Sequence, residues 1–383
     1  MILKHRLNSF ISFSSFTFSI ALSLSLLLFV LSGASFAEGL KIAIVSSPND
    51  VHDGGFNELN YNGAMDFVKE NPDSTLTVIQ EKTGDPAECL KVVGDIAADY
   101  DVIICLSFRF VGIGEVAEDN PDVKFILIDA WPYDQNGNTV AMENVDGVMY
   151  KEEEGGFFAG VAAALTTKTN KVAVVNGSAF PSNVNYQYGF MSGVNYANKH
   201  YGTKAEIVEL ASYSGTDIHG QNVGGNYIGS FIDQANGKIV GQALIREGCD
   251  VIFVAAGGAG MGVFTAAKEA KNVFIIGCDA DQYNDGINGD SNVILTSSLK
   301  VMDMNDKRVL GEIKAGTFKG GNFLLGADTN SISYVKTPGR NQMTEETIAK
   351  HDAVFELVKA GKIIPASSHS GTKPDNFAGL DAE

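Results

Sequence analysis

The segment VIFVAAGGAGMGVFTAAKEAKNVFIIG, residues 251–277, places two short apolar runs on either side of a helix-forming stretch. The runs at 251–255 and 273–276 are continuously apolar, as expected of strands that are buried on both faces of a sheet. Residues 262–270, between them, are typical of a helix. A strand–helix–strand order predicts a parallel sheet with right-handed crossovers, and therefore an α/β fold.

The same alternation continues along most of the chain. Expected strands lie at 41–45, 76–79, 102–106, 125–128, 171–175, 207–210, 251–255, 273–276 and 293–296, and expected helices at 57–70, 87–99, 155–165, 186–200, 237–247 and 262–270. Nine strands suit two sheets better than one, because a single core stops growing near this chain length. We therefore expect two lobes, with the chain crossing between them near 143–154.

The first residues carry the features of a targeting signal. Lys4 and Arg6 precede an apolar run at 16–30, and the small residues SGASFA follow at 32–37. This order predicts a signal peptide over 1–37 and an exported, periplasmic protein that starts at Glu38, with an uncleaved membrane anchor as the alternative. No cysteine follows directly after Leu31-Ser32-Gly33, so the usual lipoprotein signal is not expected here. The polar segment 366–383 is expected to be a flexible tail.

Composition excludes several classes of partner. The 383 residues contain 28 Lys and Arg against 46 Asp and Glu, a net charge of −18. This balance argues against binding to nucleic acid or to anionic lipid. Cys89, Cys105, Cys249 and Cys278 are expected to be small buried residues and not a disulfide framework, because three of them lie in or beside apolar runs. Neither CxxC nor a Cys/His metal spacing is present, so we expect no metal and no cofactor.

Motifs of known enzyme classes fail on inspection. The segment GGAGMG at 257–262 lacks the Lys-Ser/Thr of a P-loop and does not fit GxGxxG. The segment DADQYND at 279–285 lacks the glycine that a calcium loop needs at its sixth position. His52, His200, His219, His351 and His369 are scattered and are expected at the surface. We therefore predict no catalytic residues and a protein that is not an enzyme.

Polar and aromatic residues gather in loops that follow the expected strands, where open α/β sheets bind ligands. These loops carry SSPNDVHDGGFN at 46–57, Ser107 with Phe108, Asp129, the segment 227–233, Asp279 and the segment 296–300. A phenylalanine beside an asparagine, as at 56 and 57, suits a ring that is stacked and read at its edge. Other interpretations remain open: Asp53 as a helix cap with Phe56 in the core, Asp279 as a plain strand end, and Lys300 as a solvated charge.

Eight motifs, in order, carry a resemblance to a known family. They are DGGFN at 53–57, FILID at 125–129, EGGFFAG at 154–160, YGF at 188–190 with Gly193, YIGSFID at 227–233, CDVIF at 249–253 running into AGGAG at 256–260, GCDADQ at 277–282 and LTSSLK at 295–300. From about residue 41 to 364 the chain resembles the basic-membrane-protein family of exported solute-binding proteins. The resemblance implies the type I periplasmic binding fold, with two Rossmann-like lobes and a ligand cleft between them. The first lobe would comprise 38–148 with about 278–313, and the second 149–277 with about 314–365.

The better-known members of that family bind purine nucleosides for ABC importers, and the resemblance assigns roles by motif position. Phe56 and Phe231 would sandwich the base, Asn57 would contact its edge, Asp279 and Lys300 would hold the ribose, and Gly257 would bring the backbone close; Ser47, Ser107 and Asp129 complete the expected site. Ser47 stands where purine binders often carry an aspartate, so a flavin, a free base or another nucleoside is the alternative ligand.

Beyond the ligand, the expected partner is an ABC permease, and the protein is expected to be a monomer. A sensor subunit of the same fold and an exported nucleoside hydrolase are the alternative functions. Trp131 would either widen the aromatic clamp or pack against Pro132.

Overall fold

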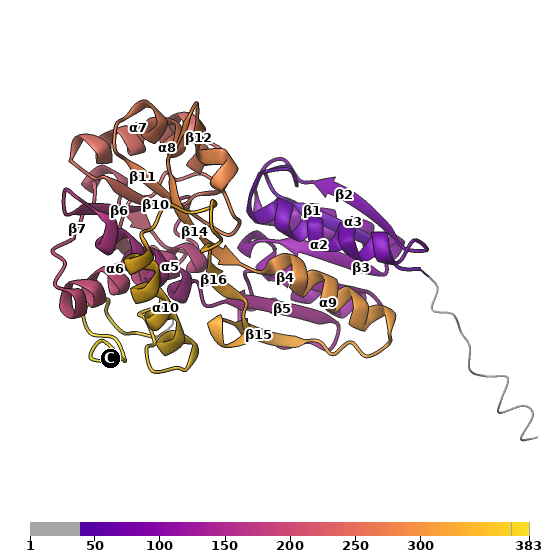
Figure 1. The fold of residues 1–383 in the computed structure, drawn as a ribbon. Coiled ribbons are helices and arrows are strands. Elements are labelled where there is room, and N and C mark those ends of the chain that lie inside the picture. Colours follow the sequence, from indigo (N-terminus) through magenta and orange to yellow (C-terminus); the bar gives the residue numbers. More distant parts are fainter. Residues whose placement is uncertain (1–38, 369, 383) are drawn as a thin grey trace, which may run out of the picture. The chain divides into compact units, whose positions relative to one another are not determined.

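The computed structural model describes residues 39–368 and 370–382, so the predicted signal peptide lies outside the described residues. The first lobe is built on a parallel six-stranded sheet in the order β15-β5-β4-β3-β1-β2 (Figure 1). Its strands are β1 (Lys41–Ser46), β2 (Thr75–Gln80), β3 (Val102–Leu106), β4 (Lys124–Ile128), β5 (Val145–Tyr150) and β15 (Gly321–Leu325). Strands β5 and β15 were not among the expected strands.

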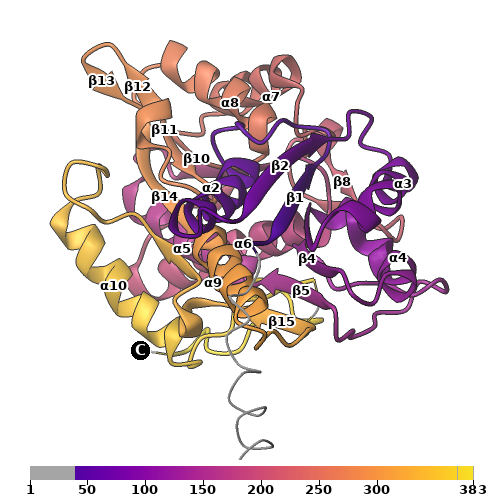
Figure 2. The same cartoon turned by 90° about the vertical axis from the view of Figure 1, so that its right-hand side faces the viewer.

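Helices cover both faces of this sheet. Alternate residues of β1 explain why: Ile42 and Ile44 pack with α2 (Phe56–Glu70) and α9 (Met302–Lys314), whereas Ala43 and Val45 pack with α3 (Pro86–Ile96). Helices α2 and α9 lie side by side (Figure 2), and the short α4 (Gly114–Asp119) follows a 3-10 turn at Phe108–Ile113. A continuously apolar strand is therefore buried on both faces, as predicted.

The second lobe has a six-stranded sheet in the order β16-β14-β11-β10-β6-β7. Its strands are β6 (Lys171–Asn176), β7 (Glu206–Ile207), β10 (Val251–Ala255), β11 (Phe274–Gly277), β14 (Ile294–Lys300) and β16 (Ile332–Tyr334), and only the β14–β16 pair is antiparallel among these described strands. Helices α5 (Glu152–Thr166), α6 (Pro181–Tyr201) and α10 (Glu345–Lys359) pack on one face, and α7 (Gln234–Arg246) and α8 (Gly257–Glu269) on the other. Short hairpins are formed by β8 (Gly215–Thr216) with β9 (Asn222–Gly224) and by β12 (Ile287–Asn288) with β13 (Ser291–Asn292).

The chain crosses between the lobes at three places: from β5 to α5, from β14 to α9, and from β15 to β16. The first is the crossing predicted near 143–154. Two predicted boundaries are wrong. Strand β14 lies within the segment assigned to the first lobe, yet it pairs with β11 and β16; β15 was assigned to the second lobe, yet it pairs with β5. Pairing partners distant in sequence decide where a strand belongs, and local pattern does not contain them.

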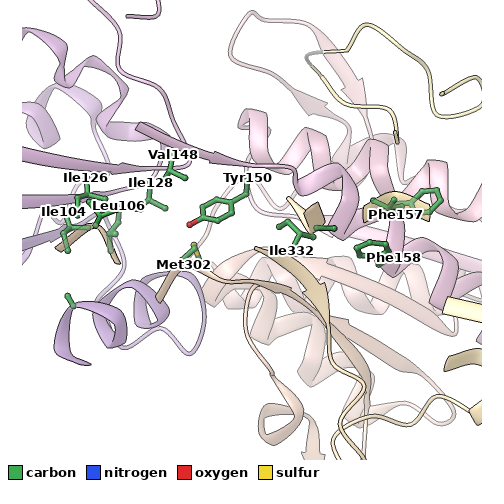
Figure 3. Close-up of a cluster of buried hydrophobic side chains, with 14 of the residues drawn as sticks. Ile104, Leu106, Ile126, Ile128, Val148, Tyr150, Phe157, Phe158, Met302 and Ile332 are labelled. Atoms are coloured by element: carbon green, nitrogen blue, oxygen red, sulfur yellow. The ribbon is translucent and has the colours of Figure 1, made fainter. Parts of the chain in front are cut away.

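One hydrophobic cluster runs through the crossings (Figure 3). Tyr150, at the end of β5, lies between Val148 and Met302 of the first lobe and Ile332 and Phe157 of the second. The cluster therefore joins the two lobes at the level of the crossing strands. The four cysteines are buried and unpaired, as predicted. Among the described residues there is no helix long and apolar enough to span a membrane.

Two surface predictions are wrong. The tail does not hang free in residues 370–382: Phe377 packs 5.8 Å from Phe157, and the Tyr196 hydroxyl donates to the Ala382 carbonyl at 2.9 Å. His351 is buried, with Nε2 2.7 Å from the Phe158 carbonyl, and burial lowers its pKa to about 4. In both segments an aromatic ring packs against α5. The polar residues beside each ring in the sequence do not indicate this packing. His369 lies outside the described residues.

Candidate ligand-binding site

A cavity lies between the lobes at the carboxyl ends of their strands, with about 690 Å³ of empty space that includes its opening. All nine residues predicted from the sequence line it: Ser47, Phe56, Asn57, Ser107 and Asp129 from the first lobe, and Phe231, Gly257, Asp279 and Lys300 from the second. They come together because the carboxyl ends of parallel strands meet at one edge of each sheet, and the two edges face the same cavity.

Aromatic rings form a row along the cavity. Phe231 lies 5.8 Å from Phe180, and Phe180 lies 5.6 Å from Phe108, measured between ring centroids. The Arg109 guanidinium lies 5.2 Å from the centre of the Phe180 ring. Gly177 makes room for this row, since a Cβ there would fall 2.2 Å from the Phe231 ring. The cavity thus offers flat apolar surfaces of the kind on which a planar ligand stacks.

Phe56 combines the two interpretations left open by the sequence. It is the first residue of α2, and its half-buried ring both lines the cavity and packs against the core. Asp53 caps the same helix, because its carboxylate accepts from the backbone N–H groups of Gly55 at 3.0 Å and Glu58 at 3.2 Å. The capped turn fixes the direction in which Phe56 and Asn57 enter the cavity.

Lys300 is not a solvated charge. Its ammonium lies 2.6 Å from Asp129 Oδ1 and 3.1 Å from Glu152 Oε1, with about 1% of the side chain exposed. It also lies 5.3 Å from the centre of the Phe56 ring. Burial raises the pKa values of Asp129 and Glu152, and Lys300 offsets only part of that rise. Burial alone would lower the pKa of Lys300, but the two carboxylates hold it above its usual value.

Asp279 is more than a plain strand end. It follows β11 with a backbone φ of +65°, and its Oδ1 accepts from the Tyr186 hydroxyl at 2.9 Å. Ser107 and Asp129 also have positive φ, at +101° and +63°. L-residues rarely adopt this region, and such positions cluster where a site needs them. Three lining residues therefore hold strained backbone at strand ends.

Part of the lining was not among the nine residues predicted from the sequence. The additional polar or aromatic residues are Asn49, Asp53, Phe108, Arg109, Phe180, Ser182, Asn183, Tyr186 and Cys278. Phe180 ends the loop between β6 and α6, and Ser182 and Asn183 lie in the first turn of α6. That loop also starts at the carboxyl end of a strand, so its position was the available signal. Trp131 does not line this cavity; its indole N–H donates to the Phe323 carbonyl at 2.9 Å, a packing role.

The described part of the chain contains no cluster of side chains suited to hold a metal ion. Within residues 39–368 and 370–382, no group of three or more His, Cys, Asp and Glu side chains is arranged to hold a metal ion. The cavity presents rings, hydroxyls, amides, carboxylates and the Lys300 ammonium.

Known proteins resemble this chain over most of its length. Residues 41–365 match the family described as ABC transporter substrate-binding protein PnrA-like. The ABC transporter nucleoside-binding protein BmpA of Lactococcus lactis subsp. cremoris is 30% identical over 328 residues, which cover 78% of this chain and 84% of that protein. Basic membrane protein A of Borreliella burgdorferi is 29% identical over 289 residues, covering 75% and 76%.

A solved structure shares the fold. The solute-binding protein of an ABC transporter system from Aeropyrum pernix K1 superimposes with a TM-score of 0.72 at 20% identity, covering 87% of this chain and 94% of that one. The shared fold agrees with the α/β architecture described above. The chain belongs to the PnrA-like family of ABC transporter substrate-binding proteins.

Proposed function

We propose that this protein is an exported receptor that captures an uncharged nucleoside in the interlobe cavity and passes it to an ABC permease. The observation that carries the proposal is the combination of aromatic rings from both lobes, Phe56 and Phe231, with the carboxylate of Asp279. Stacking contributes about 1–3 kcal/mol per base. A carboxylate that accepts from two sugar hydroxyls forms charge-assisted hydrogen bonds. The name of the Lactococcus relative, a nucleoside-binding protein, supports the same ligand class.

The charges of the cavity favour a nucleoside over a nucleotide. Lys300 is matched by Asp129 and Glu152, so its charge is not available to a phosphate. Arg109 is the other cation among the lining residues, and its Nη1 donates to the Gly84 carbonyl at 2.7 Å. Among the described residues, Asp53 and Asp279 remain as lining carboxylates without a cationic partner in hydrogen-bond contact. An anionic ligand would meet repulsion that an uncharged one avoids.

Contributions from both lobes suggest how binding is coupled to closure. A ligand between Phe56 of the first lobe and Phe231 of the second gains all its contacts only when the lobes are closed. Differential contact of this kind shifts a two-state protein toward the closed form. The crossing segments at β5–α5, β14–α9 and β15–β16 are the places where such a motion would bend the chain.

The proposal is tested on the chain from residue 38 onward. Protein purified from cells is denatured, and the released small molecules are identified by ultraviolet spectrum and mass. Thermal shift and calorimetry with adenosine, guanosine, uridine and adenosine monophosphate then rank the ligands. We expect a purine nucleoside to bind and the monophosphate to bind at least tenfold more weakly. A bound sugar without a chromophore would overturn the stacking roles, and release of free base from a nucleoside would indicate a hydrolase.

A further inference from the structure

A buried carboxylate outside the cavity contacts a residue that lines it. Glu81, after β2, is 5% exposed and is not a lining residue. Its Oε2 accepts from the Ser47 hydroxyl at 2.7 Å and from the Gly84 N–H at 2.8 Å, and its Oε1 accepts from the Thr83 N–H at 2.6 Å. Ser47 itself lines the cavity. Glu81 is therefore linked to the cavity through a single hydroxyl.

The direction of the Ser47–Glu81 hydrogen bond is fixed. Burial opposes ionisation of Glu81, but the donors from Ser47, Thr83 and Gly84 prevail and lower its pKa to about 2. At neutral pH Glu81 is a carboxylate and can only accept. The single hydroxyl hydrogen of Ser47 is consequently committed to Glu81, so Ser47, which lines the cavity, can offer its oxygen to a ligand only as an acceptor.

Asn57 is oriented in the same sense. Its Nδ2 donates to the carbonyl oxygen of Asp50 at 3.1 Å and to that of Asn49 at 3.4 Å. The reverse orientation would place an amide oxygen against two carbonyl oxygens, so the Asn57 Oδ1 is the atom left for a ligand. Two residues of the first-lobe wall, Ser47 and Asn57, thus offer acceptors and hold their donors away from the cavity.

We propose that Glu81 sets the hydrogen-bond polarity of this wall, so that the receptor selects rings whose edge carries N–H donors over rings whose edge carries only acceptors. The inference rests on the proposed nucleoside function and makes its substrate class narrower. A serine hydroxyl that is free to rotate donates or accepts as the ligand requires and discriminates poorly. Glu81 removes that freedom. It is a positioning residue, because it acts through Ser47 and does not touch the ligand.

Four purine nucleosides separate the possibilities, because they share the purine ring and the ribose and differ in the donors and acceptors at the edge of the base. Purine riboside has none, inosine has a ring N–H, adenosine has an amino group, and guanosine has both. Their dissociation constants are measured by calorimetry on the chain from residue 38 onward. The variants are Glu81→Gln, Ser47→Ala and their combination, with Glu88→Gln as the matched control, since Glu88 is exposed in the first turn of α3.

In the unmodified protein we expect purine riboside to bind at least tenfold more weakly than the best of the three donor-bearing nucleosides. Glu81→Gln and Ser47→Ala should each reduce that ratio about tenfold while changing the affinity for purine riboside by less than about twofold. A merely structural role would weaken all four ligands alike. Adding Glu81→Gln to Ser47→Ala should change the ratio no further, and Glu88→Gln should leave it unchanged.

Several outcomes overturn the inference. One is a ratio that survives both substitutions, and another is an unmodified protein that prefers purine riboside. If Glu81→Gln fails to fold, Ser47→Ala still decides, since it removes one hydroxyl and leaves the backbone donors of Glu81 in place. If none of the four nucleosides binds, the proposed function fails with it; if they bind without this discrimination, only the role of Glu81 fails. Between pH 5 and 8 the ratio should stay constant, because Glu81 remains ionised there.

Discussion

Two buried glutamates, Glu81 and Glu152, each contact a cavity-lining residue without lining the cavity themselves. Their pKa values move in opposite directions. That of Glu81 is lowered to about 2, and that of Glu152 is raised to about 7. Glu81 accepts from a hydroxyl and two backbone N–H groups, whereas Glu152 shares Lys300 with Asp129, and its Oε2 has no hydrogen-bond partner among the described residues.

The difference shows what burial demands of a carboxylate. Neutral donors replace the lost water around Glu81 and add no charge that must itself be buried. One ammonium cannot do the same for two carboxylates, so burial dominates at Glu152 even though it lies at the N-terminus of α5, where the helix dipole favours a negative charge. At neutral pH the Glu81 carboxylate stays ionised and only accepts hydrogen bonds. The Lys300 region holds two buried carboxylates for one ammonium and responds to pH.

The largest effect is expected from substitution of Lys300, whose ammonium is shared by two buried carboxylates. Lys300→Met leaves Asp129 and Glu152 buried without their shared cation, and removing one partner of a buried pair costs about 3–5 kcal/mol. Urea denaturation measures the change in the free energy of unfolding. Lys307→Met is the control: its exposed ion pair with Glu70 should contribute less than about 1 kcal/mol. Equal losses in both variants would contradict the assignment.

Glu152→Gln tests the raised pKa of Glu152 through the pH dependence of stability. The folded pKa of about 7 lies above the ordinary value of 4.5, so the folded protein holds a proton that the unfolded chain releases. The stability that this group contributes to the wild type is therefore fully present below pH 4.5 and is lost as pH rises through 7. The variant lacks this loss, so its stability relative to wild type should increase between pH 4.5 and 8. A stability difference between variant and wild type that stays constant from pH 4.5 to 8 would show that Glu152 has an ordinary pKa.

Features of the fold that depend on local sequence pattern could be predicted. Continuous apolar runs predicted β1, β3, β4, β6, β10 and β11, and the alternation with helices predicted two sheets. Strand β5 was missed because Asp146 and Gly147 interrupt VDGVMY. Strand β15 was missed because GNFLL is partly exposed at the end of its sheet and lacks the β-branched residues of the central strands. The crossing of β14 depends on partners that no local pattern contains.

The nine candidate residues share one property that a sequence can reveal, a place at the carboxyl end of a strand or at the start of the next helix, and all nine line the cavity. Their orientation could not be predicted. The pairing of Lys300 with Glu152 joins residues 148 positions apart, and the bond from Ser47 to Glu81 joins residues 34 positions apart. Such contacts follow from tertiary packing, which also explains why Lys300 resembled a solvated charge in the sequence.

Asp279 is a third carboxylate, and it accepts from two neutral donors, the Tyr186 hydroxyl and the Cys278 thiol. Asp279→Asn keeps the shape and removes the charge-assisted hydrogen bonds to a sugar, which are worth about 2 kcal/mol, or roughly thirtyfold in affinity. Calorimetry with guanosine and with 2′-deoxyguanosine measures the effect. The ribose preference should shrink in the variant and persist in Asp290→Asn, where the carboxylate is exposed in the β12–β13 hairpin. An unchanged ribose preference would remove Asp279 from the sugar site.

A substitution at Phe231 tests whether ring stacking contributes to binding, because neither Glu81 nor Glu152 contacts Phe231. Phe231→Ala should weaken nucleoside binding about tenfold, or about 1.4 kcal/mol, since it removes one stacking face. The melting temperature of the empty protein should stay nearly constant, because the ring lies half-buried in a loop before α7 and belongs to no hydrophobic core cluster among the described residues. Ile232→Ala, at a neighbouring side chain that is 57% exposed, is the matched control for the loop. If Phe231→Ala binds nucleosides normally, Phe231 is not part of the binding site, and stacking must come from the other lining rings, Phe56, Phe108 and Phe180.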